Sequence, residues 1–353
     1  MKKSVFMAAL ASLMLASCTF EEDRVKQTRE IDFTVAPYAV QSKAEHELNT
    51  AFTSPFRVWA WDADNANAVI DGKVANYQNG SDTWSVEDGP YYWPDFGLEF
   101  VAVVPATGNN YCQVNRSADG NTSIVYTFDA LNENPRTINL MHSDFTDKLT
   151  AAQGTVNLGF RHALANVNVV VKQGTVTINP EDNIVYYEVE LNAMSVEGIH
   201  RQGTYTVNSN AQNISNQVWT YEPSSPTSEI PYLSTGSKFS LNPGNVAKNY
   251  EPNDGNDIFV MPQHLDDNAK FVIDYTVITH TTSGTTTGTP KHVEVQLNTI
   301  AATGSGTTIN AWHTNKKIQY TINIMPKAEL NGIQFSASEE EWGIVSGSFD
   351  TAL

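Results

Sequence analysis

Alternation of apolar and polar side chains with a period of two residues is the dominant pattern of this sequence. The clearest run is IQYTINI, residues 318–324, in which aromatic or aliphatic side chains alternate with Gln, Thr and Asn. Successive side chains of a β-strand point to opposite faces of the sheet, so this run predicts a strand with one buried face. Similar runs occur at residues 31–35, 98–104, 271–277 and 293–297, separated by turns rich in Gly, Asn, Asp, Ser and Thr. The sequence therefore predicts an all-β fold.

Two local patterns predict a hairpin and a short helix. The alternating runs on either side of THTTSGTTTGTPK, residues 279–291, are expected to pair as a hairpin. The polar composition of this loop predicts a long, mobile tip. Helical patterns are scarce, and the best is SDFTDKLTAAQ, residues 143–153, where Ser143 is placed to cap a helix of about two turns.

The apolar pattern changes parity near the middle of the chain. In NLGFRHALANVNVVVK, residues 157–172, the apolar positions are even-numbered up to Leu164 and odd-numbered from Val167 onward. A strand cannot change faces without a bulge, a kink or a passage from one sheet to another. A chain of 353 residues also exceeds one typical domain. We therefore predict two β-sandwich domains in tandem, residues 31–163 and 164–353.

The N-terminal residues have the pattern of a lipoprotein export signal. Two lysines precede an apolar stretch at residues 5–16, which is shorter than the roughly 20 residues that cross a bilayer. Small residues then lead to Cys18, as in a lipobox, in which the Cys thiol is acylated before cleavage. We expect residues 1–18 to be the signal peptide, Cys18 to carry the lipid, and residues 19–30 to form a tether. The alternative is an ordinary secretory signal with Cys18 near the cut.

Cysteine usage and charge limit the partners of the mature chain. Cys112 is the only other cysteine, so acylation of Cys18 leaves no internal disulfide, and stability has to come from burial. The 41% hydrophobic content is sufficient for this. Because 21 Lys and Arg stand against 39 Asp and Glu, the formal charge is −18. This charge argues against nucleic acid or an anionic lipid surface as a partner.

His162 places an ionisable group inside a buried run, which raises the question of catalysis or metal binding. The chain has eight histidines, and no two have the i, i+2 or i, i+4 spacing of a metal site. A nucleophile elbow, a phosphate-binding loop and a dinucleotide fingerprint are also missing from the sequence. The default for His162 is a structural histidine that is hydrogen-bonded in the core or at a sheet edge. We therefore predict a protein that is not an enzyme and binds no metal or cofactor.

Four other segments have a functional and a structural interpretation. DADNANAVIDG, residues 62–72, and EPNDGND, residues 251–257, carry oxygens suited to calcium but lack a complete loop pattern, so hydrated turns are favoured. EEEW, residues 339–342, suggests paired catalytic carboxylates, yet neighbours on a strand face opposite sides, which favours a solvated acidic edge. YYWP, residues 91–94, is either a sugar-stacking platform or a set of strand-end aromatics that close a sandwich, and the second is favoured.

Taken together, these segments resemble one family, the Bacteroidetes fimbrillins, which are the Mfa-like subunits of type V pili. The resemblance extends over nearly the whole mature chain, through YYWPDFGLEFVAVVP, VNLGFRHALANVNVVV, IFVMPQ, and NAWHTNKKIQYTINI followed by GIQFSASEEEW. Its most distinctive motif, F-x-H-x-L-A, is present as Phe160, His162, Leu164 and Ala165. The resemblance implies transthyretin-like β-sandwich domains and an outer-membrane lipoprotein precursor at the cell surface. It also implies polymerisation by strand donation to other subunits and a role in adhesion. His162 then belongs to a structural signature.

The sequence departs from the family at the expected processing site. In the family a protease cuts between the first strand and the next, usually at Arg. Here the linker, residues 41–55, has no Arg and contains only Lys43, while Arg24 and Arg29 precede the first strand and Arg57 lies in the second. Lys43 is therefore the candidate protease site, and a different protease or no cut remain as alternatives. An uncut chain fits an anchor, a tip or an unassembled surface lipoprotein.

The resemblance also implies which segments exchange. Residues 31–40 are expected to fill the sandwich of their own chain. The donor strand is expected within residues 332–353, where Ile333, Phe335, Ile344 and Phe349 supply apolar side chains that a groove would accept. The alternative function is a surface lipoprotein that does not polymerise and binds a glycan or a host protein, through YYWP or the 279–291 loop.

Overall fold

The computed structural model describes most of the chain between residues 29 and 341 as β-strands joined by turns. The described ranges are 29–36, 52–79, 83–106, 111–130, 139–209, 219–221, 228–252, 258–304, 306–327 and 332–341. Helical elements within these ranges include three short 3-10 turns, η1 (Pro180–Asp182), η3 (Pro243–Asn245) and η5 (Leu297–Thr299). The predicted all-β fold is confirmed.

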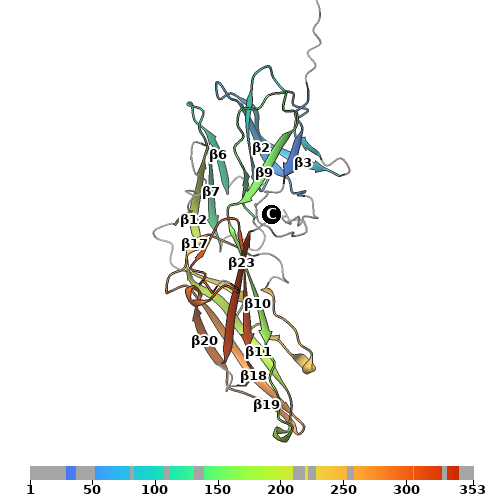
Figure 1. The fold of residues 1–353 in the computed structure, drawn as a ribbon, viewed down its shortest axis with the longest axis vertical. Coiled ribbons are helices and arrows are strands. Elements are labelled where there is room, and N and C mark those ends of the chain that lie inside the picture. The colour runs from blue at the N-terminus through green and yellow to red at the C-terminus, as the bar shows by residue number, and fades with distance from the viewer. Residues whose placement is uncertain are drawn as a thin grey trace, which may run out of the picture.

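The strands lie in two halves stacked along the long axis of an elongated molecule (Figure 1). In the upper half, a seven-stranded sheet with the order β1-β9-β8-β5-β2-β3-β4 packs against a four-stranded sheet with the order β13-β12-β7-β6. The strands of the first sheet are β1 (Phe33–Ala36), β2 (Phe56–Asp62), β3 (Ala68–Gln78), β4 (Thr83–Val86), β5 (Leu98–Val104), β8 (Met141–Ser143) and β9 (Val156–His162). Those of the second are β6 (Cys112–Arg116), β7 (Thr122–Asp129), β12 (Gln202–Asn208) and β13 (Trp219–Tyr221).

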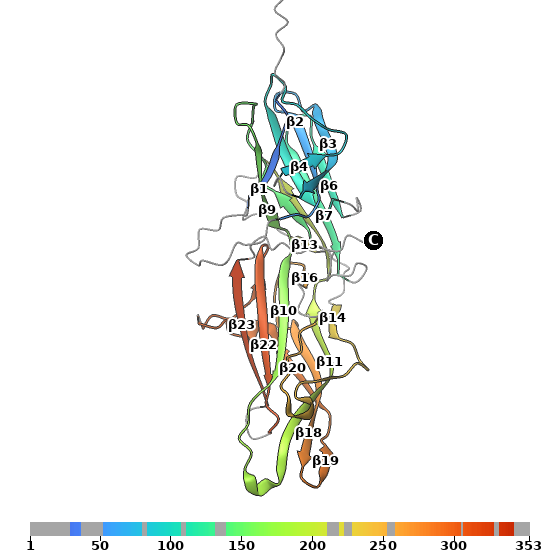
Figure 2. The same cartoon turned by 90° about the vertical axis from the view of Figure 1, so that its right-hand side faces the viewer.

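The lower half also contains two sheets, which Figure 2 shows from the side. One has the order β16-β10-β22-β23, and the other has the order β14-β11-β18-β19, with β15 paired to β11 and β20 to β18. The strands of the first are β10 (Ala165–Gln173), β16 (Phe259–Val260), β22 (Lys316–Ile324) and β23 (Ile333–Glu341). Those of the second are β11 (Ile184–Ile199), β14 (Ser228–Leu233), β15 (Phe239–Ser240), β18 (Lys270–Thr281), β19 (Gly284–Thr287) and β20 (Lys291–Gln296). A short pair, β17 (Gln263–His264) and β21 (Ala311–Trp312), lies apart from both sheets.

Two hydrophobic cores share the seven-stranded sheet. All seven of its strands contribute to a core on one face, so the sheet curls around that core and its edge strands β1 and β4 come close together. Its other face, which includes Trp59 and Val101, belongs to a second core that continues through the middle of the molecule into the lower half. Central strands such as β2 are therefore buried on both faces, and their sequence shows little alternation.

The chain passes from the upper to the lower half where the apolar parity changes. β9 belongs to the seven-stranded sheet and β10 to the lower four-stranded sheet, and the chain bends between them at Ala163 and Leu164. The chain returns to the upper half at β12 and β13. There β12 pairs with β7 on one side and with β13 on the other. The division at residues 31–163 and 164–353 stays a prediction. So do the signal peptide and the tether, of which only residues 29 and 30 are described.

The predicted helix at residues 143–153 is wrong. The segment runs extended beside β5, and Leu149 forms an isolated bridge with Leu98 through hydrogen bonds of 2.7 and 2.8 Å. The start of β5 offers backbone N–H and C=O groups, and pairing with them outweighs the weak helical preference of the segment.

The predicted hairpin is confirmed, but its loop differs from the prediction. β18 pairs with β20, with Phe271 opposite Val295 and Ile273 opposite Val293. The expected mobile tip is instead largely strand, because β18 continues to Thr281 and β19 turns back along it. Threonine is β-branched and favours extended backbone, which explains why a polar Thr-rich loop continues the sheet.

Candidate functional site

The first strand, β1, completes the upper core from the edge of its sheet. It runs parallel to β9, with Phe33 opposite Val156 and Ala36 opposite Gly159. Phe33 is fully buried and Ile31, just before the strand, is 4% exposed. Burial of these two side chains contributes roughly 3 to 6 kcal/mol in total, at about 1.5 to 3 kcal/mol each. A short N-terminal segment therefore supplies a substantial part of this core.

The ring of Phe33 occupies an aromatic hole in this core. It meets the rings of Phe56 and Phe100 edge to face, with centroids 6.5 and 5.8 Å apart. Edge-to-face packing places the positive edge of one ring against the negative face of another, which adds to the burial energy. The hole is therefore shaped for an aromatic side chain.

The backbone of residues 29–36 is hydrogen-bonded on both of its sides. Before the strand, Ile31 donates to the carbonyl of Tyr91 at 2.8 Å, and Trp93 donates to the carbonyl of Arg29 at 2.9 Å. On the other side, Val156 of β9 donates to the carbonyl of Asp32 at 2.8 Å. The segment thus lies between a rim formed by residues 91–93 and the edge of β9. We call this space the β1 recess.

The YYWP segment contains both buried and exposed aromatic side chains. Trp93 is 5% exposed and Tyr91 packs against the upper core, so these two aromatics close the sandwich. Tyr92 points the other way and is 45% exposed, and Phe96 a few residues later is 40% exposed. Two exposed aromatic side chains are therefore present within residues 92–96.

After β1 the chain is described again from Phe52, which is buried in the same core. Its ring stacks on Phe160 at 5.2 Å and lies 5.7 Å from the ring of Trp84. Residues 37–51, including the candidate protease site Lys43, lie outside the described residues, and so does Cys18. No helix in the described ranges is long and apolar enough to cross a membrane.

The four signature residues lie together at the passage between the halves. Phe160 is fully buried in the upper core, whereas Leu164 and Ala165 are fully buried in the core that continues downward. His162 is 3% exposed, and its Nδ1 lies 2.8 Å from Oδ1 of Asn139. These contacts agree with a structural role for His162, which stays a prediction.

Side chains distant in sequence hold this passage in place. Asn315 accepts from the backbone N–H of His162 at 3.2 Å, and its own N–H donates to the carbonyl of Leu164 at 3.2 Å. The indole N–H of Trp219 donates to the carbonyl of Ala163 at 2.8 Å. Sequence reasoning missed these two residues, because nothing in their local pattern indicates which carbonyl or amide they meet.

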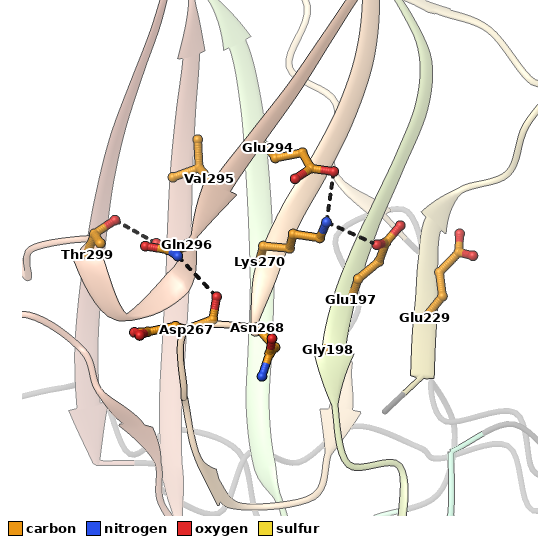
Figure 3. A pocket seen from close by; sticks show the side chains of 10 residues that line it. All are labelled: Glu197, Gly198, Glu229, Asp267, Asn268, Lys270, Glu294, Val295, Gln296 and Thr299. Atoms are coloured by element: carbon orange, nitrogen blue, oxygen red, sulfur yellow. Dashed lines mark hydrogen bonds and ion pairs between the residues drawn. The ribbon is translucent and has the colours of Figure 1, made fainter. Parts of the chain in front are cut away.

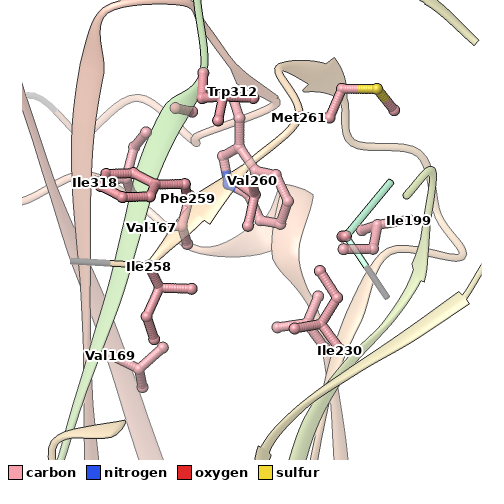
Figure 4. Packing of buried hydrophobic residues seen from close by; sticks show 14 of the residues in the cluster. Val167, Val169, Ile199, Ile230, Ile258, Phe259, Val260, Met261, Trp312 and Ile318 are labelled. Carbon is pink, nitrogen blue, oxygen red and sulfur yellow. The ribbon is translucent and has the colours of Figure 1, made fainter. Parts of the chain in front are cut away.

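The IFVMPQ segment is apolar without alternation because its side chains are buried on both sides. Ile258, Phe259, Val260 and Met261 are all buried, among the residues that Figure 4 shows around β10 and β11. Gln263 is 4% exposed and bonds the backbone of His200 in both directions, accepting at 2.7 Å and donating at 2.9 Å. The amide therefore fixes the turn that leads from β11 into β12.

His142 is a second buried histidine near the passage. It is 3% exposed, and its Nδ1 lies 2.9 Å from the carbonyl of Ser143. Burial lowers the pKa of His142, because water no longer solvates the charged ring; this outweighs the opposing effects of the Ser143 carbonyl and of Asp144. The ring is therefore held in its neutral form.

The remaining candidate segments form ordinary polar contacts where they are described. Asp62 accepts from the Asp64 backbone and the Asn65 side chain, and Lys148 bonds both carboxylate oxygens of Asp64 at 2.7 Å. Of residues 251–257, only 251 and 252 are described. Glu339 and Glu340 lie on β23 opposite β22. Among the described residues, no group of three or more His, Cys, Asp and Glu is placed to hold a metal.

An open polar hollow of about 900 Å³ lies on the outer face of the lower six-stranded sheet. In it, Lys270 reaches Glu294 at 2.8 Å and Glu197 at 3.6 Å, as Figure 3 shows. The lysine is paired with its neighbours on the sheet, and ion pairs that water screens in this way contribute little to the stability of a fold. The described residues that line the hollow include no Ser, Cys or His.

The fold and the β1 recess define an elongated all-β protein whose upper core is completed by its N-terminal strand. A family model described as fimbrillin-like matches residues 43–342, and the chain belongs to that family.

Solved structures share this fold. The chain is similar to a fimbrial protein from Bacteroides vulgatus, with a TM-score of 0.54 and 15% identity over 89% of this chain and 100% of that one. It is also similar to a candidate cell adhesion protein from Bacteroides uniformis, with a TM-score of 0.51 and 16% identity over 90% and 99% of the two chains. At these identities the likeness shows the fold alone. No curated protein matches the sequence.

Proposed function

We propose that the protein is a structural subunit of a cell-surface fimbria, assembled by strand exchange from a lipid-anchored precursor, with a role in adhesion and no catalytic activity. The observation that carries the proposal is β1, an edge strand that fills the upper core. Membership of the fimbrillin-like family supports the fimbrial role. The partners are other fimbrial subunits, and the outer membrane through lipid on Cys18.

Removal of β1 would create an acceptor for a new strand. The edge of β9 would lose its partner over residues 156–159, and the space left by Ile31 and Phe33 would open the upper core. Free N–H and C=O groups beside an apolar groove bind an extended segment with alternating side chains, as in β-strand addition. A subunit without β1 is therefore completed by a strand from a neighbour.

The positions of the arginines support a cut within residues 37–51. A cut at Arg29 would leave β1 attached to the body, because Arg29 precedes the strand. Arg57 lies inside β2, opposite Val74 on one side and Val103 on the other, where a protease cannot reach the backbone. Lys43 lies in the linker between β1 and Phe52, so a cut there would separate β1 from the body.

We assign the donor segment to a narrower range than the predicted 332–353. Residues 333–341 form β23, which pairs with β22 along its whole length, and Phe335 stacks near Phe271 at 6.5 Å. This part of the range belongs to the lower sandwich of its own chain. We therefore assign donation to the residues after Glu341, which lie outside the described residues.

A disulfide that locks β1 to β9 tests the proposal. Thr34 lies opposite Asn157 in the parallel pair, so Thr34→Cys with Asn157→Cys joins β1 to the body. Cys18→Ser removes the lipid site. Cys112 is buried, which raises the pKa of its thiol to about 12 and keeps it from exchange.

With a specific protease site inserted in the linker, the uncut chain should be a monomer and the cut chain should polymerise. The oxidised double-cysteine chain should stay monomeric after the cut, and a reducing agent should restore assembly. Light scattering and size-exclusion chromatography follow the reaction. Polymers from the cut, oxidised chain would show that assembly does not require release of β1.

The exposed aromatics favour one alternative function, a surface lipoprotein that binds a glycan without polymerising. Tyr92 and Phe96 are 45% and 40% exposed, and open aromatic rings are suited to stacking on sugar rings. Binding to a glycan array that is lost in Tyr92→Ala and kept in Tyr186→Ala, together with a cut chain that stays monomeric, would select this alternative.

A further inference from the structure

We propose that the outer face of the lower four-stranded sheet binds the same face of a second copy of this chain, side by side. We call this surface the uncharged face. It consists of six outward side chains of β22 and β23: Gln319, Thr321, Asn323, Gln334, Ser336 and Ser338. The contact itself is independent of strand exchange, and only its consequence for fibres rests on the proposed function.

Strand pairing places the uncharged face on the flank of the lower half. Every second residue of β22 from Ile318 to Ile324 is buried in the lower core, so the residues between them point outward. β10 continues the face on the other side of β22, where Asn168 lies beside Gln319. Figure 2 shows β10, β22 and β23 side by side and extended along the long axis of the molecule. The face therefore points sideways, away from the two ends.

The uncharged face offers hydrogen-bonding groups that its own chain does not use. Within the described ranges, none of its six side chains has a hydrogen-bond or ion-pair partner. A carboxamide both donates and accepts hydrogen bonds, and so does a hydroxyl group. Such a face is complementary to a copy of itself, which is the requirement for a contact with two-fold symmetry.

The outer face of the lower six-stranded sheet has the opposite character. Its outward ionisable side chains include Glu188, Glu190, Glu197, Lys270, Asp274 and Glu294. Each of these six has an oppositely charged or histidine partner on the same side of the sheet. Charged side chains are depleted from the cores of protein–protein contacts, because burial removes them from water. The uncharged face is therefore the better contact surface of the two.

Charge favours a second copy as the partner. The chain has a formal charge of −18, so two copies repel each other wherever their carboxylates meet. The outward charges of the four-stranded sheet lie at its ends, with Lys172 at one end and Lys317 opposite Glu340 at the other. Two copies can therefore approach here without repulsion between carboxylates. A glycan is disfavoured, because no aromatic side chain points outward from β22 or β23 to stack on a sugar.

A single contact of this kind is weak. Hydrogen bonds between uncharged side chains replace hydrogen bonds to water, so each one contributes little net free energy. The uncut chain should therefore be a monomer in dilute solution and should pair only near about 1 mM. In a fibre the same contact repeats along the length, and linked weak contacts add up to strong binding. Fibres should therefore associate side by side.

A cysteine trap tests the contact in the uncut Cys18→Ser chain, which cannot exchange strands. Thr321 lies on β22 between β10 and β23, so a two-fold contact brings it close to its own copy. Thr321→Cys should form disulfide-linked dimers at least about tenfold faster than the control Thr287→Cys, because pairing raises the effective concentration of the thiol. Thr287 is an exposed threonine of β19 on the other sheet, and Cys112 is buried. Equal rates would contradict the contact.

Added charge tests the contact without cysteines. Thr321→Asp should weaken self-association by at least about tenfold, because two carboxylates would meet across the contact. Thr287→Asp adds the same charge to the other sheet and should leave self-association unchanged, and Thr321→Asn should preserve it. Salt should strengthen the association, because it screens the net charge of the two copies. Sedimentation equilibrium measures these changes, and urea denaturation confirms that each variant is folded. Self-association that survives in Thr321→Asp, or that salt abolishes, would overturn the proposal.

Two further results would separate this contact from its alternatives. If the uncut chain stays monomeric above about 1 mM but binds a neutral polysaccharide, and Thr321→Asp abolishes that binding, the partner is a glycan and a second copy is wrong. With a protease site in the linker, electron microscopy of the cut chain should show bundled fibres that separate into single fibres in Thr321→Asp. If the cut chain forms no fibres while the uncut chain pairs, strand exchange is wrong and the contact stands.

Discussion

At the scale of single residues, the passage between the two halves depends on buried polar side chains with specific partners. His162 lies against Asn139, Gln263 bonds the backbone of His200, and the indole of Trp219 bonds the carbonyl of Ala163. A buried polar group costs free energy unless it is hydrogen-bonded, so each of these contacts favours one arrangement of the chain over others.

His162→Ala should lower the free energy of unfolding by about 1 to 3 kcal/mol, because the contact with Asn139 is lost and a buried amide loses its partner. Urea denaturation measures the change. His292→Ala is the matched control, because the side chain of His292 is 59% exposed and its loss should have little effect. Stoichiometric zinc that disappears in His162→Ala would instead identify a metal site.

The pKa of His142 predicts a loss of stability in acid. Because burial lowers this pKa in the folded state, the unfolded chain binds a proton more readily than the folded chain does. The contribution of the neutral ring is therefore fully present above the ordinary histidine pKa of about 6.5, and it is lost as the pH falls from there toward the lower folded pKa. Two charged groups also act on the ring: Asp144, which directly follows β8, raises the pKa of His142, and Arg161 on the neighbouring β9 lowers it.

His142→Phe should therefore flatten the dependence of stability on pH below about 6.5. The free energy of unfolding, measured by urea titration at several pH values, gives this slope. His292 serves as the control, because hydrogen bonds to Asp274 and Glu294 raise its pKa and give it the opposite sign. An unchanged slope in His142→Phe would show that another group is responsible for the acid sensitivity.

At the scale of elements, the sequence predicts strands well where one face is exposed. β22 was predicted residue by residue, because its outer side chains are polar and its inner ones are buried. β2 gives no clear period, since both of its faces are buried. The extended 144–149 segment was missed because its structure comes from pairing with Leu98, which lies 51 positions before Leu149 and which no local pattern reveals.

The sequence predicted the first strand of the β1 recess but not the residues that surround it. Alternation at residues 31–35 indicated that the first strand is buried, and the resemblance indicated that it exchanges. The rim at residues 91–93 was not predictable, because its contacts with β1 use backbone groups that every residue possesses. The register of Phe33 against Val156 likewise follows from packing of the whole upper core.

Phe33→Ala tests how strongly β1 is held in the uncut chain. Loss of the ring should make docking of β1 less favourable by about 3 to 5 kcal/mol. Val156 donates to the carbonyl of Asp32, so its amide should exchange hydrogen much faster once β1 undocks. Thr34→Ala is the matched control with a half-buried side chain in the same strand. Equal exchange at Val156 in both variants would show that the ring does not hold the strand.

At the scale of the whole molecule, the order of the parts along the chain links anchoring to assembly. The predicted lipid on Cys18 precedes β1, and the segment between β1 and Phe52, which holds most of the predicted linker, follows it. A cut in the linker would therefore remove the anchor and vacate the recess in one step. The freed body would then stay at the cell surface only through a strand supplied by a neighbour.

Cys18→Ala should separate these two effects. Without acylation the uncut chain should leave the membrane fraction, because two acyl chains are needed for stable anchoring and the described residues contain no membrane-spanning helix. The fold should be unchanged, since Cys18 lies ahead of every described strand. Cys112→Ser is the control that keeps the lipid. Partitioning between detergent and aqueous phases measures the anchor, and a fatty-acid probe reports acylation.

The same measurement follows the effect of the cut. With Cys18 intact and a protease site in the linker, the cut should move the body to the aqueous phase while the fragment that carries β1 stays with the detergent. This result requires the lipid and β1 to lie on the same side of the cut and β1 to dissociate from the recess. A body that stays with the detergent after a complete cut would show either that β1 remains docked or that the anchor lies elsewhere. The fatty-acid probe distinguishes these cases on a denaturing gel: label on the fragment that carries β1 shows that β1 remains docked, and label on the body shows that the anchor lies elsewhere.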